Sequence, residues 1–193
     1  NNGAMFPRLA TEVPTVGNGG ISSDLKSITW SLKPGILWSD GTPFTSADVL
    51  FTYDYCMGEA GCYQEAKFEG VTNVEALDDL TVKISFADPM PNPYGPFVGS
   101  QTPILQQAQF ENCTGTRRQE CTEENFGPIG TGPFVVTEFK PNDVIQLKAN
   151  DNYRDPNKPA FATMVFKGGG DAAAAGRAVM ETGEYDYGWN LQL

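Results

Sequence analysis

The chain has 193 residues, of which 40% are hydrophobic and 11% aromatic, and its formal net charge is −11. This composition predicts a folded protein with one ordinary core or two small lobes, and it argues against general disorder. The acidic balance excludes nucleic acid as a partner, because no cluster of Lys or Arg is present to neutralise a phosphate backbone. No window approaches the ~20 consecutive apolar residues of a membrane-spanning helix, and the N-terminus lacks the features of a signal peptide.

The first predicted elements are a strand and a capped helix. Residues 27–33 alternate apolar and polar side chains, which is typical of a strand with one buried face. The dipeptide Asp40-Gly41 predicts a tight turn after the short apolar piece 36–38. Thr45 and Asp48 have the spacing of a capping box, so we expect a helix from about Ser46 to Met57.

A hairpin and an irregular stretch are expected next. The alternating segments 71–77 and 81–86 flank Asp78-Asp79, which predicts two antiparallel strands joined at that turn. Residues 89–96 contain four prolines and predict a loop. Pro103 suits the first position of a short helix that runs towards Phe110.

The second half predicts three strands, a helix and a last strand. We expect a lobe boundary at about residues 123–129, because the polar loop between Cys113 and Cys121 ends there. Asp171 is a suitable helix cap and Gly183 a helix stop. The last strands and the helix predict a βαβ unit with parallel strands and a right-handed crossover. The expected strands are 134–139, 144–148, 162–167 and 185–189, and the expected helix is 172–181.

Four cysteines form two close pairs, Cys56 with Cys62 and Cys113 with Cys121. The loop-like residues between them favour two local disulfides and an oxidising compartment. Free buried thiols remain an alternative. A metal site is the weaker alternative, because the spacing differs from C-x2-C and the sequence contains no His.

The sequence offers no convincing catalytic group or cofactor site. Triad-type hydrolysis is disfavoured by the absence of His. The acidic pairs Asp78-Asp79 and Glu123-Glu124 are typical of solvated turns. The glycines at 168–170 lack the Lys and Ser/Thr of a phosphate loop. We therefore predict no catalytic residue, no metal and no cofactor.

The aromatic residues are the remaining candidates for ligand binding. Strand alternation predicts that Trp30 is a core residue, whereas Trp38, at a turn, is equally compatible with core and site. Trp189 ends the last expected strand, and ligands bind at the carboxyl ends of strands in open α/β sheets. Trp189 and Asn190 therefore have the best claim to a ligand site, with core packing as the alternative.

Three stretches together resemble the extracellular solute-binding protein family 5, the oligopeptide-, dipeptide- and nickel-binding receptors of ABC importers. They are residues 33–49 (KPGILWSDGTPFTSADV), the Gly130–Phe134 stretch followed by 147–153, and residues 180–186 (METGEYD). The resemblance covers about residues 8 to 193, and the family's chains are more than twice this length. The chain is thus interpreted as a piece of a longer protein.

The resemblance implies an α/β (mixed α+β) fold: the first lobe of a type II periplasmic binding protein, with mixed sheets and flanking helices. It implies that residues 1–124 form the smaller subdomain of that lobe, that 125–193 belong to the larger subdomain, and that the second lobe is absent. The stretch from Trp38 to Thr45 is expected to be structural. Residues just after the third match line the cleft in peptide-binding relatives, which independently favours Trp189 and Asn190. The cysteine pairs are outside the family pattern.

The resulting functional prediction is a receptor that binds a solute, with a peptide as the leading ligand class, for uptake through an ABC transporter permease by hinged closure of two lobes. An oligosaccharide receptor of the same family is the alternative ligand class, since aromatic platforms also suit sugars. A carboxylate-dependent secreted hydrolase and a structural or adhesive module are the alternatives of other classes. We expect a periplasmic or extracellular location, with membrane contact only through the transporter or a lipid anchor.

Overall fold

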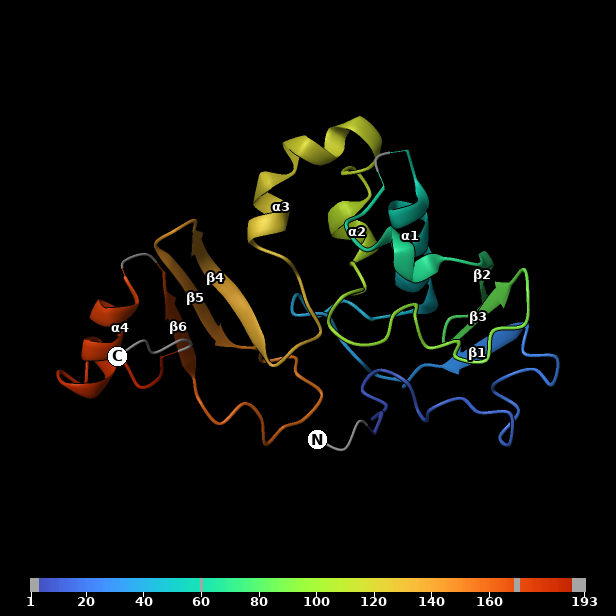
Figure 1. Cartoon of the computed structure of the whole chain (residues 1–193), viewed down its shortest axis with the longest axis horizontal. Coiled ribbons are helices and arrows are strands. Elements are labelled where there is room, and N and C mark those ends of the chain that lie inside the picture. The colour runs from blue at the N-terminus through green and yellow to red at the C-terminus, as the bar shows by residue number, and fades with distance from the viewer. Residues whose placement is uncertain (1–3, 60, 169–170, 189–193) are drawn as a thin grey trace.

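The computed structural model describes residues 4–59, 61–168 and 171–188. Its strands form two three-stranded sheets, which lie on opposite sides of α3 (Thr122–Phe126) in Figure 1. The first sheet is built from residues before 87 and the second from residues after 133. Together the elements give the mixed helix and sheet fold that the sequence predicts.

The first sheet is antiparallel, with the strand order β1-β3-β2. The hairpin of β2 and β3 is the one predicted from the sequence. Ile28 and Ile84 face each other across β1 and β3 and are completely buried, because this face of the sheet is covered by the main hydrophobic cluster. The strands are β1 (Ser27–Ser31), β2 (Val71–Asp78) and β3 (Thr81–Phe86).

Helix α1 (Ser46–Met57) has the predicted bounds and the predicted cap. The Asp48 carboxylate accepts a hydrogen bond from the Thr45 backbone N–H, and the Thr45 hydroxyl accepts one from the first turn. These bonds satisfy N–H groups that have no partner inside the helix. α1 packs against β2 and β3, with Val49 in the core.

Short helices lie between the longer elements in the chain order, before β2 and after β3. The predicted helix at Pro103 begins only at Gln107, which corrects the sequence-based expectation. The reason is that the N–H groups of Leu105 and Gln107 donate to Thr52 and Asp48 of α1, and the backbone between them is extended at Gln106. The short helices are η1 (Glu65–Phe68), α2 (Gln107–Phe110), η2 (Gly115–Glu120) and α3 (Thr122–Phe126).

The second sheet is an antiparallel meander followed by helix α4 (Ala172–Met180), which Asp171 caps as predicted. The predicted strand at 185–189 is wrong for its described part, 185–188, and so is the parallel βαβ unit. The N–H groups of Glu184 and Tyr185 donate to Ala178 O, so this backbone is tied to the helix end and is not available to a sheet. The strands are β4 (Phe134–Lys140), β5 (Val144–Ala149) and β6 (Thr163–Lys167).

The second sheet contributes no fully buried hydrophobic side chain among the described residues. Phe139, Ile145 and Phe166 lie opposite one another on the three strands and share one face. Phe166 is 53% exposed and Phe139 is 36% exposed. An apolar face of this kind is typical of a sheet that other parts of a protein cover. None of the helices in the described ranges is long and apolar enough to cross a membrane.

Candidate functional site

The two residues predicted to bind ligand, Trp189 and Asn190, lie outside the described residues. The described chain leads to them from α4 through Asp186, Tyr187 and Gly188. Tyr187 is 76% exposed. An aromatic ring this exposed is available for stacking on a ligand group.

The stretch from Trp38 to Thr45 forms a turn and a helix start, as expected. Trp38 is only 2% exposed and packs edge-on against Phe44, with ring centroids 5.7 Å apart. Its indole N–H donates to the Asp48 carboxylate at 3.2 Å. Trp38 is therefore a core residue, and the sequence alone left this undecided.

The buried Asp48 carboxylate organises three segments. It accepts hydrogen bonds from the Trp38 indole, from the Thr45 backbone and from the Gln107 backbone. Asp48 is 6% exposed, and a buried carboxylate is tolerated where N–H donors surround it. The residue thus joins the turn, α1 and α2, which is a structural role.

The carboxylate of Asp40 is held by Gln106, a buried side chain from the start of α2. The Gln106 amide donates to Asp40 at 2.8 Å and to the Thr42 hydroxyl at 2.9 Å. Burial raises the pKa of Asp40, but the hydrogen bonds from Thr42 and Gln106 outweigh it, and the net pKa lies below its usual value. Asp40 is therefore a stabilised anion in a turn.

The three-residue network of Ser39, Gly130 and Asn152 connects the two sheets. Ser39 N donates to Gly130 O at 3.0 Å, and the Asn152 side chain donates to Ser39 O at 3.1 Å. The neighbouring Asn150 side chain donates to Gly132 O at 2.7 Å. These residues come from the first two stretches that carry the family resemblance, so the stretches meet in space. No contact of the Asn150 or Asn152 side chain was predicted from the sequence.

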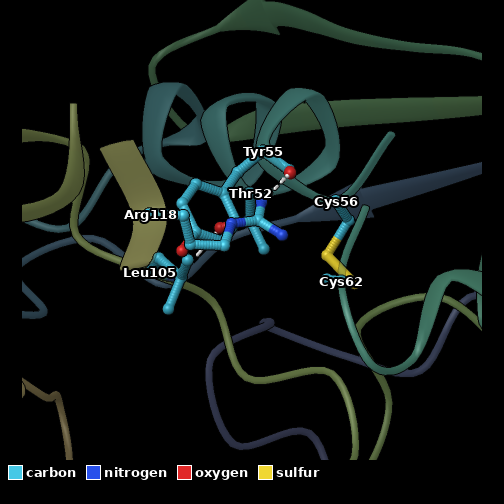
Figure 2. Close-up of a disulfide and its surroundings, with 6 residues drawn as sticks. All are labelled: Thr52, Tyr55, Cys56, Cys62, Leu105 and Arg118. Carbon is cyan, nitrogen blue, oxygen red and sulfur yellow. Dashed lines mark hydrogen bonds between the residues drawn. A yellow bond between two sulfur atoms is a disulfide. The ribbon is translucent and has the colours of Figure 1, made fainter. Parts of the chain in front are cut away.

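Both predicted disulfides are present. Cys56 is bonded to Cys62 with a Cα–Cα distance of 4.6 Å, and Cys113 to Cys121 with 5.9 Å. Figure 2 shows the first bond at the end of α1, close to Arg118. The guanidinium of Arg118 lies over the Tyr55 ring, and it also donates to Tyr55 O. The loop closed by the second disulfide thus contacts the helix end that the first disulfide closes.

The described residues hold one cluster with the composition of a metal site, formed by Cys113, Cys121 and Glu124. Both sulfurs are bonded to each other, whereas zinc binding requires thiolates. The acidic pair Asp78-Asp79 lies at the hairpin turn, where Asp78 accepts from Leu80 N, in agreement with a turn role.

The fold and these motifs match one protein family. The family model for bacterial extracellular solute-binding proteins, family 5 Middle, covers residues 4–193. The chain belongs to this family. A Brucella ovis protein, named as an ABC transporter peptide-binding protein, is 29% identical over 170 residues, which are 86% of this chain and 31% of that one.

Solved structures of solute-binding proteins are similar to this chain in fold. The oligopeptide-binding protein AppA of Bacillus subtilis, solved with a nonapeptide, is 27% identical with a TM-score of 0.76 over 92% of this chain and 34% of that one. The ABC transporter substrate-binding protein CtaP of Listeria monocytogenes is 28% identical with a TM-score of 0.74 over 91% of this chain and 34% of that one. The chain therefore spans about a third of the length of the relatives that it matches.

Proposed function

We propose that the full-length protein is a receptor that binds peptides outside the cytoplasm and delivers them to an ABC transporter permease. The observation that carries this proposal is the family match over residues 4–193, together with the similarity to proteins named as peptide-binding. The two disulfides support an oxidising compartment, periplasmic or extracellular, with or without a lipid anchor.

In this proposal the chain supplies the first lobe of a two-lobed receptor. Residues 1–124 form the smaller subdomain and residues 125–193 part of the larger one. The separation of the two sheets supports a boundary close to this point, because residues 127–133, which directly follow α3, contain no helix or strand. The exposed apolar face of the second sheet also supports it, since a larger subdomain needs further chain to complete its core.

In this proposal Trp189 and Asn190 contact the ligand. The Trp189 ring stacks on ligand side chains, and the Asn190 amide forms hydrogen bonds with polar groups of the ligand. Their position in the sequence, just beyond Gly188 and the exposed Tyr187, supports this assignment. The function is capture by hinged closure, in which two lobes exclude water from the solute, and it requires no catalytic group.

The test has two steps. A peptide library is first screened for binding to the full-length protein, and the affinity of the best peptide is then measured by isothermal titration calorimetry. We expect micromolar or tighter binding, and a loss of about ten-fold or more in affinity for Trp189→Ala. Tyr63→Ala is the matched control, because Tyr63 is 98% exposed and belongs to the first 124 residues.

Two results would contradict the proposal in different ways. Binding of sugars but not of peptides would show that the ligand class is wrong and would leave the proposed receptor function intact. Equal affinity of the Trp189→Ala and Tyr63→Ala variants for the peptide would remove Trp189 from the site and leave the receptor function intact.

A further inference from the structure

A concave site lies beside the first sheet. It is a cavity of about 610 Å³, within the range of small-molecule sites. Its walls come from the segment of residues 5–13, from β1 and α1, and from the loop 97–104. They are almost entirely apolar, with Trp30, Leu32, Val49 and Phe97 among the lining residues.

The segment 5–13 is held in place as one wall of this cavity. Thr11 N donates to Ser31 O at 2.8 Å, and Lys33 N donates to Leu9 O at 2.8 Å, so the segment runs along the end of β1. The Lys33 ammonium donates to Pro7 O at 2.9 Å. The wall therefore belongs to the fold of the first sheet.

The opposite wall contains an unusual backbone conformation. Phe97 has a backbone φ of 59°, a left-handed value that residues other than Gly rarely adopt. Its ring packs edge-on against the buried Phe68, with centroids 5.3 Å apart, and also lines the cavity. A strained residue that persists in a cavity wall is typical of positions where the surrounding structure fixes a binding surface.

The positive charge beside this cavity indicates which chemical group the ligand carries. Among the described residues that line it, Arg8 is the one with an ionisable side chain, and it is exposed. Within the described ranges, the three salt bridges involve other residues, so the Arg8 guanidinium has no acidic partner. A free guanidinium beside an apolar cavity complements a molecule with an apolar body and an anionic end.

We propose that this cavity is a binding site for an amphipathic carboxylate, with its apolar body against Trp30 and Phe97 and its carboxylate on Arg8. The site lies against the first sheet, and Trp189 and Asn190, which come after α4 in the sequence, are not among its described lining residues. The proposal does not depend on the peptide function.

The test measures binding of dodecanoate and of uncharged dodecanol, below their aggregation limits, to the full-length protein by isothermal titration. Arg8→Gln should weaken dodecanoate about ten-fold and leave dodecanol within about two-fold. Lys148→Gln, on an exposed position of β5, removes the same charge far from the cavity and should change neither affinity. Trp30→Phe should abolish the change in tryptophan emission on binding while dodecanoate still binds.

Three outcomes would overturn the inference. Absence of dodecanoate binding to the full-length protein would show that the cavity is filled or closed there. Equal effects of Arg8→Gln and Lys148→Gln on the affinity for dodecanoate would show that Arg8 does not contact the carboxylate. Complete displacement of dodecanoate by a peptide ligand would place it in the peptide site.

Discussion

Arg118 caps the end of α1 through Tyr55, although the two residues are 63 positions apart in the sequence. The guanidinium carbon lies 3.8 Å from the centre of the Tyr55 ring, and Nη2 donates to Tyr55 O (Figure 2). The last turn of α1 contains no basic residue of its own. A cation at this place complements the partial negative charge of a helix C-terminus.

Arg118→Ala should lower the free energy of unfolding by about 1–2 kcal/mol, because it removes a cation–π contact and a charged hydrogen bond. Arg117→Ala is the matched control, since Arg117 is exposed, and we expect a change within about 0.5 kcal/mol. Guanidinium chloride unfolding of both variants measures the difference. Equal losses would show that Arg118 does not stabilise α1.

The two disulfides should contribute unequally. Loss of Cys113–Cys121 by double Ala substitution should cost about 3 kcal/mol and loss of Cys56–Cys62 about 2 kcal/mol. The sulfurs of Cys113 and Cys121 lie in a buried cluster with Phe110, whereas Cys62 is only partly buried. Thermal unfolding of the two double variants under oxidising conditions compares them. A larger loss for the Cys56 and Cys62 variant would contradict this order.

The carboxylate of Asp40 should make stability depend on acid pH. Its folded pKa lies below the unfolded value, so its contribution is present above about pH 4 and is lost as pH falls through the folded pKa. Gln106→Met removes one donor and should raise the pKa of Asp40, which moves the loss to higher pH. NMR titration of the Asp40 carboxyl in both proteins is the measurement. An unchanged or lower pKa in the variant would exclude the Gln106 contact as a cause.

The two sheets of the isolated 193-residue chain should differ in how strongly their backbone amides are protected from hydrogen exchange. Hydrogen exchange in β4, β5 and β6 should be at least about ten-fold faster than in β1 and β3, because the second sheet has no fully buried hydrophobic residue among those described. In the full-length protein the difference should shrink, because the proposed larger subdomain would cover the apolar face with further chain. Equal protection of the two sheets in the isolated chain would show that the second sheet needs no cover.

Elements whose signals are local could be predicted from the sequence. The capping box at Thr45 and Asp48 placed α1 correctly, and the turn at Asp78-Asp79 placed the hairpin. The cysteine spacing also predicted both disulfides. In each case the interacting residues lie within 15 positions of one another, so the local pattern contains both partners.

Relations between distant segments could not be predicted. The delayed start of α2 depends on two side chains of α1, and the predicted strand after α4 is prevented by bonds to Ala178 O. Asn152 contacts Ser39 across 113 positions, and no local pattern indicates that pairing. The ligand role of Trp189 and Asn190 stays a prediction.

Both disulfides close short loops before residue 122, so no covalent cross-link joins the two sheets. Apart from the main chain through residues 127–133, they are connected by noncovalent contacts such as those of Ser39 with Gly130 and Asn152. A protease that cut this segment would therefore yield two polypeptides that separate in denaturant even without a reducing agent. The same segment is the natural place to divide the chain for expression of the disulfide-bonded part alone.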